Sequence, residues 1–417
     1  MKPPVQRRTG ALDGRTPGEV AARLRHLPGM VFFDTAGHLP ASYRNPVSII
    51  AAEPVEVLKG SIHDPADRCR LEEVLNKRSG GPAADCGFPE GGLCGWVDYE
   101  GDFVFGDYPE MLIHTHDGGW HEIGSLSEKL AEPADDRPSL GDVTPVWPRQ
   151  RFLDAVGRIR EWIAAGDIYQ VNISQRFEVE VRGPSLFGLY EQLRAASPSP
   201  MAAWLSLDGR EVLSSSPETF LRISGRGIET RPIKGTRPRF ADPVADRRSA
   251  YELQTSPKEI AELVMITDLL RNDLGQVCEF GSVEVDEMLQ LETLEQVHHL
   301  VSTVSGTLRE DVGPVGALAS CFPGGSITGA PKRRAMQIIR ELEGGPRGIY
   351  CGAIGYLGYN GESQFSIAIR TMVREGGQLQ FHAGAGIVAD SDAEKEFEET
   401  LHKAEGIRLA LERFRGE

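Results

Sequence analysis

The chain has 417 residues, of which 40% are hydrophobic and 25% charged, and its formal net charge at pH 7 is −16. A chain of this length can bury a large core, and its composition is that of an ordinary globular protein, which excludes wholesale disorder. The acidic balance argues against nucleic acid or an anionic membrane as a partner, so an anionic substrate must be held by locally placed cations.

The first part of the chain is predicted to be rich in strands. Within residues 16–130, short β-type runs lie at 31–33 and 47–50, and residues 66–77 have the character of a helix.

A proline-containing connection follows this region. Residues 132–138 are mostly polar or charged and include two prolines, a composition that is typical of a linker. We therefore expect a boundary between a strand-rich N-terminal region, residues 1–135, and a second domain over residues 148–412.

The second region begins with a helix and continues with strands. The spacing of apolar residues predicts a helix over 152–163, and alternation over 169–181 predicts a long, half-buried strand. Successive strands with short turns favour antiparallel pairing over β-α-β units. The further strand-like runs lie at 211–215, 219–223 and 227–230.

A weak internal repeat relates residues 92–101 to residues 352–361. Each copy places an aromatic and an aliphatic residue after two spaced glycines. Two similar strands on opposing sheets would explain this pattern.

Cysteine usage and hydropathy bear on the compartment. No apolar run approaches a membrane-spanning length, and residues 1–15 lack the apolar core of a signal peptide. The cysteines form no C-x-x-C pair, which suits buried thiols in a reducing compartment better than zinc or disulfides. They are Cys69, Cys86, Cys94, Cys278, Cys321 and Cys351. We therefore predict a soluble, cytoplasmic protein.

The most unusual stretch is 230–239, in which Lys234 lies between two prolines and among three arginines. Gly235 beside it permits a positive φ or the close approach of another group. Neighbouring cations and burial both disfavour a protonated amine, and a neutral amine is a nucleophile or a base. The alternative interpretation is a solvated basic loop.

Two predicted helices carry Glu-x-x-Glu pairs. In the helix over 258–273, Glu259 and Glu262 share a face, and the apolar run after Glu262 indicates that this carboxylate is partly buried. In the C-terminal helix, Glu396 and Glu399 share a face in the same way. Such carboxylates suit Mg²⁺, which takes one or two of them together with substrate oxygens. The alternative for the first pair is a solvated acidic face.

Three further stretches could bind an anion. Residues 322–332 form a small-residue loop before a helix, but they lack the Gly-Lys-Ser/Thr that a phosphate loop requires. Arg370 lies in a strand predicted over 365–373, where its guanidinium could hold a carboxylate or simply lie on the sheet surface. Residues 381–389 imitate a dinucleotide-binding glycine loop between strand and helix. No parallel strand follows, so a dinucleotide fold is not expected, although the glycine amides could still contact an anion.

Five ordered motifs resemble those of the chorismate-utilising enzymes, over residues from about 150 to 412. The motifs are residues 232–236, 268–273, 298–302, 323–332 and 384–388. The resemblance implies an α+β fold with a large two-sheet, mostly antiparallel β core and flanking helices. Lys234 matches a position at which aminodeoxychorismate synthase component I has lysine and anthranilate synthase large subunits typically have alanine. Gln170 matches a water-activating lysine of isochorismate and salicylate synthases, and glutamine is not a base.

The resemblance is therefore closest to the aminodeoxychorismate synthase component I group, and it implies roles for individual residues. Lys234 would attack C2 of chorismate as the C4 hydroxyl leaves, and ammonia would then add at C4 and release the lysine. Glu218 would be the general acid and base. Glu262 and Glu399 would hold Mg²⁺, with support from Glu259 and Glu396. The substrate-contacting positions implied are Gly235, Thr236, His299, Ser326, Tyr350, Arg370, Gly384, Ala385, Gly386 and Lys403.

The resemblance also implies a partner and a second pocket. Ammonia would come from a separate glutamine amidotransferase subunit, and the product, 4-amino-4-deoxychorismate, would serve p-aminobenzoate and folate synthesis. Residues 31–35 and Pro200-Met201 match an amino-acid pocket that binds tryptophan in some relatives, although residues 35–45 depart from the usual pattern. Two alternatives stay open, namely anthranilate synthase component I and a non-catalytic binding subunit.

Overall fold

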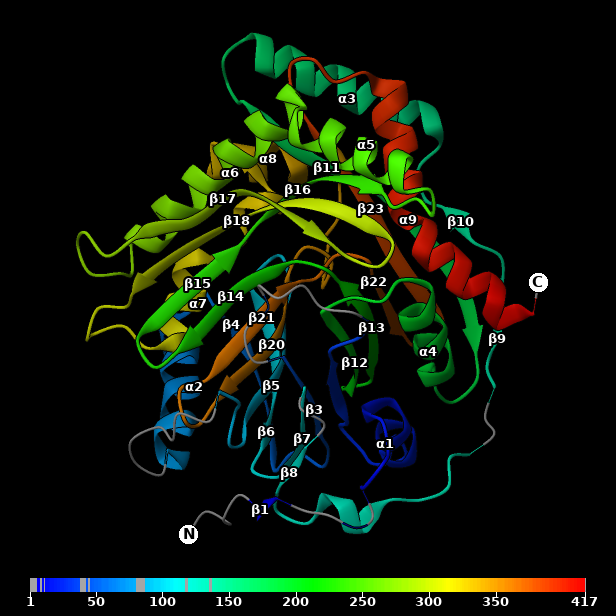
Figure 1. Cartoon of the computed structure of the whole chain (residues 1–417), viewed down its shortest axis with the longest axis vertical. Coiled ribbons are helices and arrows are strands. Elements are labelled where there is room, and N and C mark those ends of the chain that lie inside the picture. Colours follow the sequence, from blue (N-terminus) through cyan, green and yellow to red (C-terminus); the bar gives the residue numbers. More distant parts are fainter. Residues whose placement is uncertain are drawn as a thin grey trace.

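The computed structural model describes residues 6–7, 10, 12–37, 43, 46–79, 87–116, 119–134 and 137–416. Its strands form two large sheets, of 13 and 10 strands, in which neighbouring strands pair antiparallel. The helices lie around these sheets (Figure 1). The predicted α+β architecture with two antiparallel sheets and flanking helices is therefore confirmed.

The larger sheet contains strands from the whole length of the chain. Its order is β1 (Gln6–Arg7), β8 (Trp120–Ile123), β7 (Met111–Thr115), β3 (Val47–Ala51), β2 (Val31–Asp34), β12 (Met201–Leu207), β13 (Arg210–Ser216), β22 (Thr371–Glu375), β23 (Gln378–Ile387), β11 (Gln170–Arg182) and β10 (Thr144–Pro145), with β9 (Ser139–Leu140) and β19 (Gly329–Ala330) also paired to β11.

The smaller sheet carries the stretch around Lys234. Its order is β16 (Ile233–Pro238), β18 (Val297–Thr307), β15 (Gly227–Arg231), β14 (Thr219–Ser224), β21 (Ser363–Ile367), β20 (Ala353–Gly358), β5 (Gly92–Val97), β6 (Asp102–Tyr108) and β4 (Glu56–Ser61), with β17 (Glu284–Thr293) also paired to β18.

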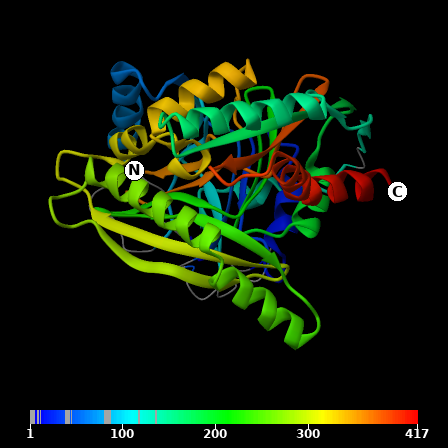
Figure 2. The same cartoon turned by 90° about the horizontal axis from the view of Figure 1, so that it is seen from above.

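The helices cover the outer faces of the sheets. They are α1 (Pro17–Leu24), α2 (Pro65–Arg78), α3 (Arg149–Ala164), α4 (Phe187–Ala196), α5 (Pro243–Gln254), α6 (Pro257–Gly275), α7 (Pro314–Cys321), α8 (Lys332–Glu343) and α9 (Ala393–Arg415), with the 3₁₀ turns η1 (Leu126–Lys129) and η2 (Gly325–Ile327). Seen from above, α3 and α8 lie along one side of the strands and α5 and α6 along the other (Figure 2). No helix in the described part of the chain is long and apolar enough to cross a membrane.

Local sequence explains where α6 and α9 begin. Ser256 caps α6 by accepting a hydrogen bond from the amide of Glu259, and Pro257 occupies the first turn. Asp392 caps α9 by accepting from the amide of Lys395. These caps fix the starts of α6 and α9, so that the Glu-x-x-Glu pairs project from the first two turns of each helix.

Strands from residues 1–135 and from residues 148–412 share both sheets. β2 pairs with β12 in the larger sheet, and β5 pairs with β20 in the smaller one. An apolar cluster between the sheets also joins the two regions, through side chains such as Trp96 and Ile354. The predicted boundary thus separates stretches of sequence that pack into common sheets. Part of the predicted linker, residues 135–136, lies outside the described residues.

Both stretches of the predicted internal repeat form strands, but their predicted placement is wrong. Residues 92–101 and 352–361 do not lie on opposing sheets, because β5 and β20 are antiparallel neighbours in which Gly95 faces Gly355. A Cβ atom on either glycine would lie 1.9 Å from a carbonyl oxygen of the next strand. Close strand approach therefore requires glycine at both positions.

The prediction that the thiols are buried is confirmed for four of the five cysteines that the structure describes. Cys94, Cys278, Cys321 and Cys351 are buried and free, whereas Cys69 is exposed on α2. Cys86 lies outside the described residues.

Candidate active site

Lys234 is carried into the site by a bulge in β16. The register of β16 against β18 shifts between Lys234 and Thr236, and Gly235 has a φ of +71°. A Cβ atom on Gly235 would lie 2.6 Å from Cδ1 of Leu253, so both the conformation and the space require glycine. Nζ of Lys234 donates a hydrogen bond to the carbonyl of Ser326 at 3.4 Å.

The three arginines near Lys234 are each engaged with a carboxylate. The pairs are Arg231 with Glu292, Arg237 with Glu259 at 3.7 Å, and Arg239 with Asp246 at 2.9 Å. Their charges are therefore balanced locally, and their effect on the amine stays a prediction. The carboxylates of Glu218, Glu262 and Glu399 interact electrostatically with Lys234 instead.

Glu218 lies just before β14 and is only 6% exposed. Burial raises the pKa of its carboxyl group to about 7, although a hydrogen bond from Ser326 and the charges of Lys234 and Lys403 oppose this rise. A carboxyl group with this pKa can donate and accept a proton near neutral pH, which is what a general acid and base requires.

His299 on β18 presents an unused ring nitrogen. Its Nδ1 lies 3.0 Å from the hydroxyl of Thr236 and 3.3 Å from the carbonyl of Gly235, while its buried Nε2 has no hydrogen-bond partner. Burial lowers the pKa of the ring to about 4, and the charge of Arg370 contributes to this shift. The ring is therefore neutral at pH 7. Because the carbonyl of Gly235 can only accept, Nδ1 carries the proton of the neutral ring. Nε2 is then unprotonated and can accept a hydrogen bond.

Arg370 does not lie within a strand, as predicted, but at the break between β21 and β22. Its φ is +51°, a left-handed conformation that alternation in the sequence does not reveal. Among the described residues its guanidinium has no hydrogen bond or ion pair, and burial alone lowers its pKa. A cation in this state is suited to an incoming carboxylate, which it can grip with two hydrogen bonds.

The glycine motif also differs from its prediction, because Gly384, Ala385 and Gly386 lie within β23 and not in a loop. A Cβ atom on Gly386 would lie 2.4 Å from Nε2 of Gln170. A Cβ atom on Gly384 would lie 2.9 Å from the hydroxyl of Tyr350. These glycines therefore let polar side chains lie directly against the strand beside Lys234.

Glu262 on α6 and Glu399 on α9 face each other closely enough to interact electrostatically. Nζ of Lys403 lies 2.7 Å from Glu399 and donates to the carbonyl of Gly384 at 3.1 Å. Burial raises the pKa of Glu262. Burial also acts to raise the pKa of Glu399, but the charges of Lys403, Lys258 and Lys234 together with the hydrogen bond from Lys403 outweigh it, so this pKa is lowered.

The donor set fits a hard cation only if the substrate completes it. Oε1 of Glu262 is buried and accepts no hydrogen bond. Within the described residues, no group of three or more His, Cys, Asp or Glu side chains could hold a metal by itself. Two carboxylates plus substrate oxygens is an arrangement that Mg²⁺ accepts.

The structure brings nearly all the predicted site residues into one region. They come from β16, β18, β23, α6, α9 and the segments around Glu218, Ser326, Tyr350 and Arg370, which are linked by the contacts above. Glu396 and Glu259 also lie there, but as members of ion pairs with Lys258 and Arg237.

Sequence reasoning missed Arg347. This buried side chain pairs with Glu343 at 2.7 Å and donates to the carbonyls of Ile327 and Asn172. It thereby fixes the turn that contains Ser326. The four-residue spacing from Glu343 was visible in the sequence, but exposed ion pairs have the same spacing.

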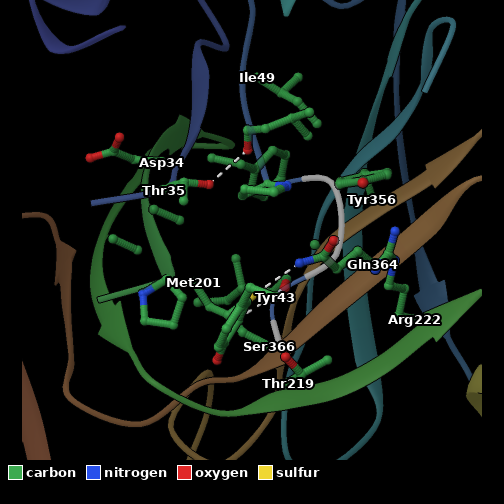
Figure 3. A pocket seen from close by; sticks show the side chains of 18 of the residues that line it. Asp34, Thr35, Tyr43, Ile49, Met201, Thr219, Arg222, Tyr356, Gln364 and Ser366 are labelled. Atoms are coloured by element: carbon green, nitrogen blue, oxygen red, sulfur yellow. Dashed lines mark hydrogen bonds between the residues drawn. The ribbon is translucent and has the colours of Figure 1, made fainter. Parts of the chain in front are cut away.

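Away from Lys234, a cavity of about 50 Å³ lies between the two sheets (Figure 3). Of the predicted stretch 31–35, residues 33–35 line this cavity, together with Pro200 and Met201. The hydroxyl of Tyr43 donates to the carbonyl of Pro217 at 3.2 Å, and its ring lies 5.0 Å from the guanidinium carbon of Arg231. An amino-acid ligand for this cavity stays a prediction.

Comparison with known proteins identifies relatives of the chain. A family model described as a chorismate binding enzyme matches residues 76–408. Anthranilate synthase component 1 of Methanothermobacter thermautotrophicus is 40% identical over 346 residues, which cover 77% of this chain and 74% of that protein. Aminodeoxychorismate synthase component 1 of Salmonella typhimurium is 48% identical over 321 residues, which cover 75% and 70%. Against some other anthranilate synthase components the match spans only 52% to 62% of the relative.

A solved structure is similar over most of its length. Anthranilate synthase component I from Streptococcus pneumoniae has a TM-score of 0.76 and 30% identity, and the match covers 89% of this chain and 94% of that one. Proteins with two different synthase names are therefore similar to this chain at comparable identity.

Proposed function

Since this chain belongs to the family of chorismate-binding enzymes, we propose that it is an aminodeoxychorismate synthase component I, which converts chorismate and ammonia to 4-amino-4-deoxychorismate. The observation that carries this proposal is the pairing of Lys234 with Glu218. An amine on a constrained bulge and a carboxyl group with a pKa of about 7 interact electrostatically, and both contact Ser326. A nucleophile beside an acid and base is the arrangement that covalent substitution requires.

The charged groups suit the two carboxylates of chorismate. Arg370 has no counter-ion among the described residues and would hold the enolpyruvyl carboxylate with two hydrogen bonds. Glu262 and Glu399 would hold Mg²⁺, which when bound supplies positive charge that offsets the ring carboxylate. Nε2 of His299 would accept a hydrogen bond from the substrate.

The first step forms one bond and breaks another. The lone pair on Nζ of Lys234 attacks C2, the two ring double bonds shift, and the C4–O bond breaks. Protonated Glu218 donates its proton to the departing hydroxyl, which leaves as water.

The second step reverses the shift. Ammonia attacks C4, the double bonds return to their first positions, and the C2–N bond to Lys234 breaks. The Glu218 carboxylate accepts a proton from the nitrogen that has added, so the enzyme returns to its starting protonation state.

Ammonia is proposed to come from a separate glutamine amidotransferase. The relatives from Methanothermobacter and Salmonella are both named component 1, which supports a second component. With that partner, glutamine would replace free ammonia as the nitrogen source, and the product would feed p-aminobenzoate and folate synthesis.

Product identification tests the proposal against its nearest rival, anthranilate synthase component I. The protein is incubated with chorismate, Mg²⁺ and an ammonium salt, and the products are separated by chromatography. We expect 4-amino-4-deoxychorismate, which a lyase then converts to p-aminobenzoate. Fluorescent anthranilate formed without a lyase would overturn the proposal. Lys234→Ala should abolish the amination, whereas Lys77→Ala, an exposed lysine on α2, should not.

A further inference from the structure

Lys258 lies between the two helices that carry the glutamates, and the reaction proposed above gives it no role. It is in the first turn of α6, where Nζ is 3.2 Å from Oε1 of Glu396 on α9 and 4.0 Å from Oε1 of Glu262 on its own helix. Its side chain is 46% exposed, whereas that of Glu396 is only 3% exposed. The lysine therefore reaches from solvent into a largely buried acidic cluster.

Three cations neutralise the four carboxylates of this cluster, so one cation must serve two of them. Four carboxylates project from α6 and α9, and each has a cation near it. The cations are Arg237 at 3.7 Å from Glu259, Lys403 at 2.7 Å from Glu399, and Lys258 beside both Glu262 and Glu396. Lys234 adds an electrostatic interaction with Glu262 and Glu399, but its amine is needed for the chemistry. Lys258 is thus the cation shared by Glu262 and the neighbouring helix.

Lys258 offsets charge without occupying the oxygen that a metal would use. At 4.0 Å its ammonium is beyond hydrogen-bond distance from Oε1 of Glu262, and this buried oxygen accepts no hydrogen bond. Oε2 of Glu396 is likewise buried and without a partner. Buried carboxylates need a nearby cation, and the half-exposed, flexible stem of a lysine can supply one that is able to withdraw.

We propose that Lys258 is the internal counter-cation of the Glu262 carboxylate, which stabilises the cluster before Mg²⁺ arrives and opposes its binding electrostatically. The proposal rests on the metal site assigned to Glu262 and Glu399 above. Two cations a few ångströms apart repel each other, so bound Mg²⁺ drives the ammonium toward solvent. Lys258 thereby sets the affinity for the metal. If it were only a strut between α6 and α9, its loss would weaken the fold and leave metal affinity unchanged.

Titration of the full-length protein with Mg²⁺ alone, without chorismate, tests this inference. Isothermal titration calorimetry gives the Kd, and thermal unfolding with and without Mg²⁺ gives the stabilisation. For Lys258→Met we expect Mg²⁺ to bind about tenfold more tightly, since a positive charge beside the Glu262 carboxylate is removed. The variant should be less stable than the wild type without metal and should gain more stability from it. Lys258→Arg keeps the charge and should bind Mg²⁺ as the wild type does.

Controls separate failure of this inference from failure of the metal site. Lys77→Met, an exposed lysine on a distant helix, should leave the Kd unchanged, and Glu262→Gln should weaken binding. Unchanged or weaker binding in Lys258→Met, with Glu262→Gln still impaired, would overturn the role of Lys258 and leave the metal site standing. Equal binding by Glu262→Gln and wild type would overturn both. If Lys258→Met does not fold, Lys258→Gln is measured in its place with the same expected tightening.

Discussion

Replacing Glu218 by glutamine should stabilise the protein at alkaline pH while abolishing its proposed chemistry. Burial raises the pKa of this carboxyl group from 4.5 to about 7, so the folded state holds its proton over a range in which the unfolded chain has lost it. The contribution of Glu218 to the free energy of unfolding is therefore fully present below pH 4.5, and it is lost as the pH rises through 7. Glutamine has the same shape and cannot ionise, so it avoids this loss.

The expected size follows from the two pKa values. A difference of about 2.5 pH units, at about 1.4 kcal/mol each, makes the ionised carboxylate cost ~3 kcal/mol of folding free energy above pH 8. At pH 5 the unfolded carboxyl group is already roughly three-quarters ionised while the folded one still holds its proton, and the cost is ~1 kcal/mol. The gain from Glu218→Gln should therefore grow by ~2 kcal/mol between these pH values.

Urea denaturation of wild type and Glu218→Gln at pH 5 and pH 8 measures this gain. Glu341→Gln, an exposed glutamate on α8, is the matched control and should show no such pH dependence. The activity of the wild type should decline above pH 7 as Glu218 loses its proton, and Glu218→Gln should lose about 10²- to 10⁴-fold in kcat. A variant whose stability relative to wild type is the same at both pH values would refute the buried-acid reasoning.

Three further substitutions test how the site is built. Gly235→Ala should lower the free energy of unfolding by about 1–3 kcal/mol in urea and impair activity, because φ is positive and the added Cβ would meet Leu253. Wild-type stability and activity in this variant would contradict the need for glycine. Arg370→Met should raise the KM for chorismate roughly 10- to 100-fold at unchanged Tm, since a charged bidentate contact is lost and no protein partner is left behind; an unchanged KM would exclude it from substrate binding. Arg347→Met should cost about 3–5 kcal/mol in urea denaturation, because the Glu343 carboxylate is left buried without a counter-cation. A cost below about 1 kcal/mol would show that the stability of the fold does not depend on this ion pair.

The elements with strong local patterns could be predicted from sequence. The helices predicted over 66–77, 152–163 and 258–273 correspond to α2, α3 and α6, and the run over 169–181 corresponds to β11. Caps and apolar spacing act within a few residues, so they can be read directly. The motifs also named most of the residues that the fold brings together around Lys234.

Features that depend on long-range packing could not be predicted. The pairing of β5 with β20 joins distant segments, and nothing in either strand specifies its neighbour. The partner of Arg231 is Glu292 on another strand, so the local run of arginines suggested a concentration of charge that the fold neutralises. Arg370 interrupts an alternating pattern with a single left-handed residue, because the chain turns there between two strands. Alternation of apolar and polar residues indicates which face of a sheet each side chain lies on, but it does not indicate where the strand ends.

The most direct test of the account is the intact mass of the protein after incubation with chorismate and Mg²⁺ in the absence of ammonia. The covalent mechanism predicts an adduct of chorismate minus water, which peptide mapping locates on Lys234 and which ammonium then discharges. The adduct should be absent from Lys234→Ala and present in Lys77→Ala. An unmodified wild-type protein that still aminates chorismate, or an adduct on another residue, would contradict the assignment of Lys234 as the nucleophile.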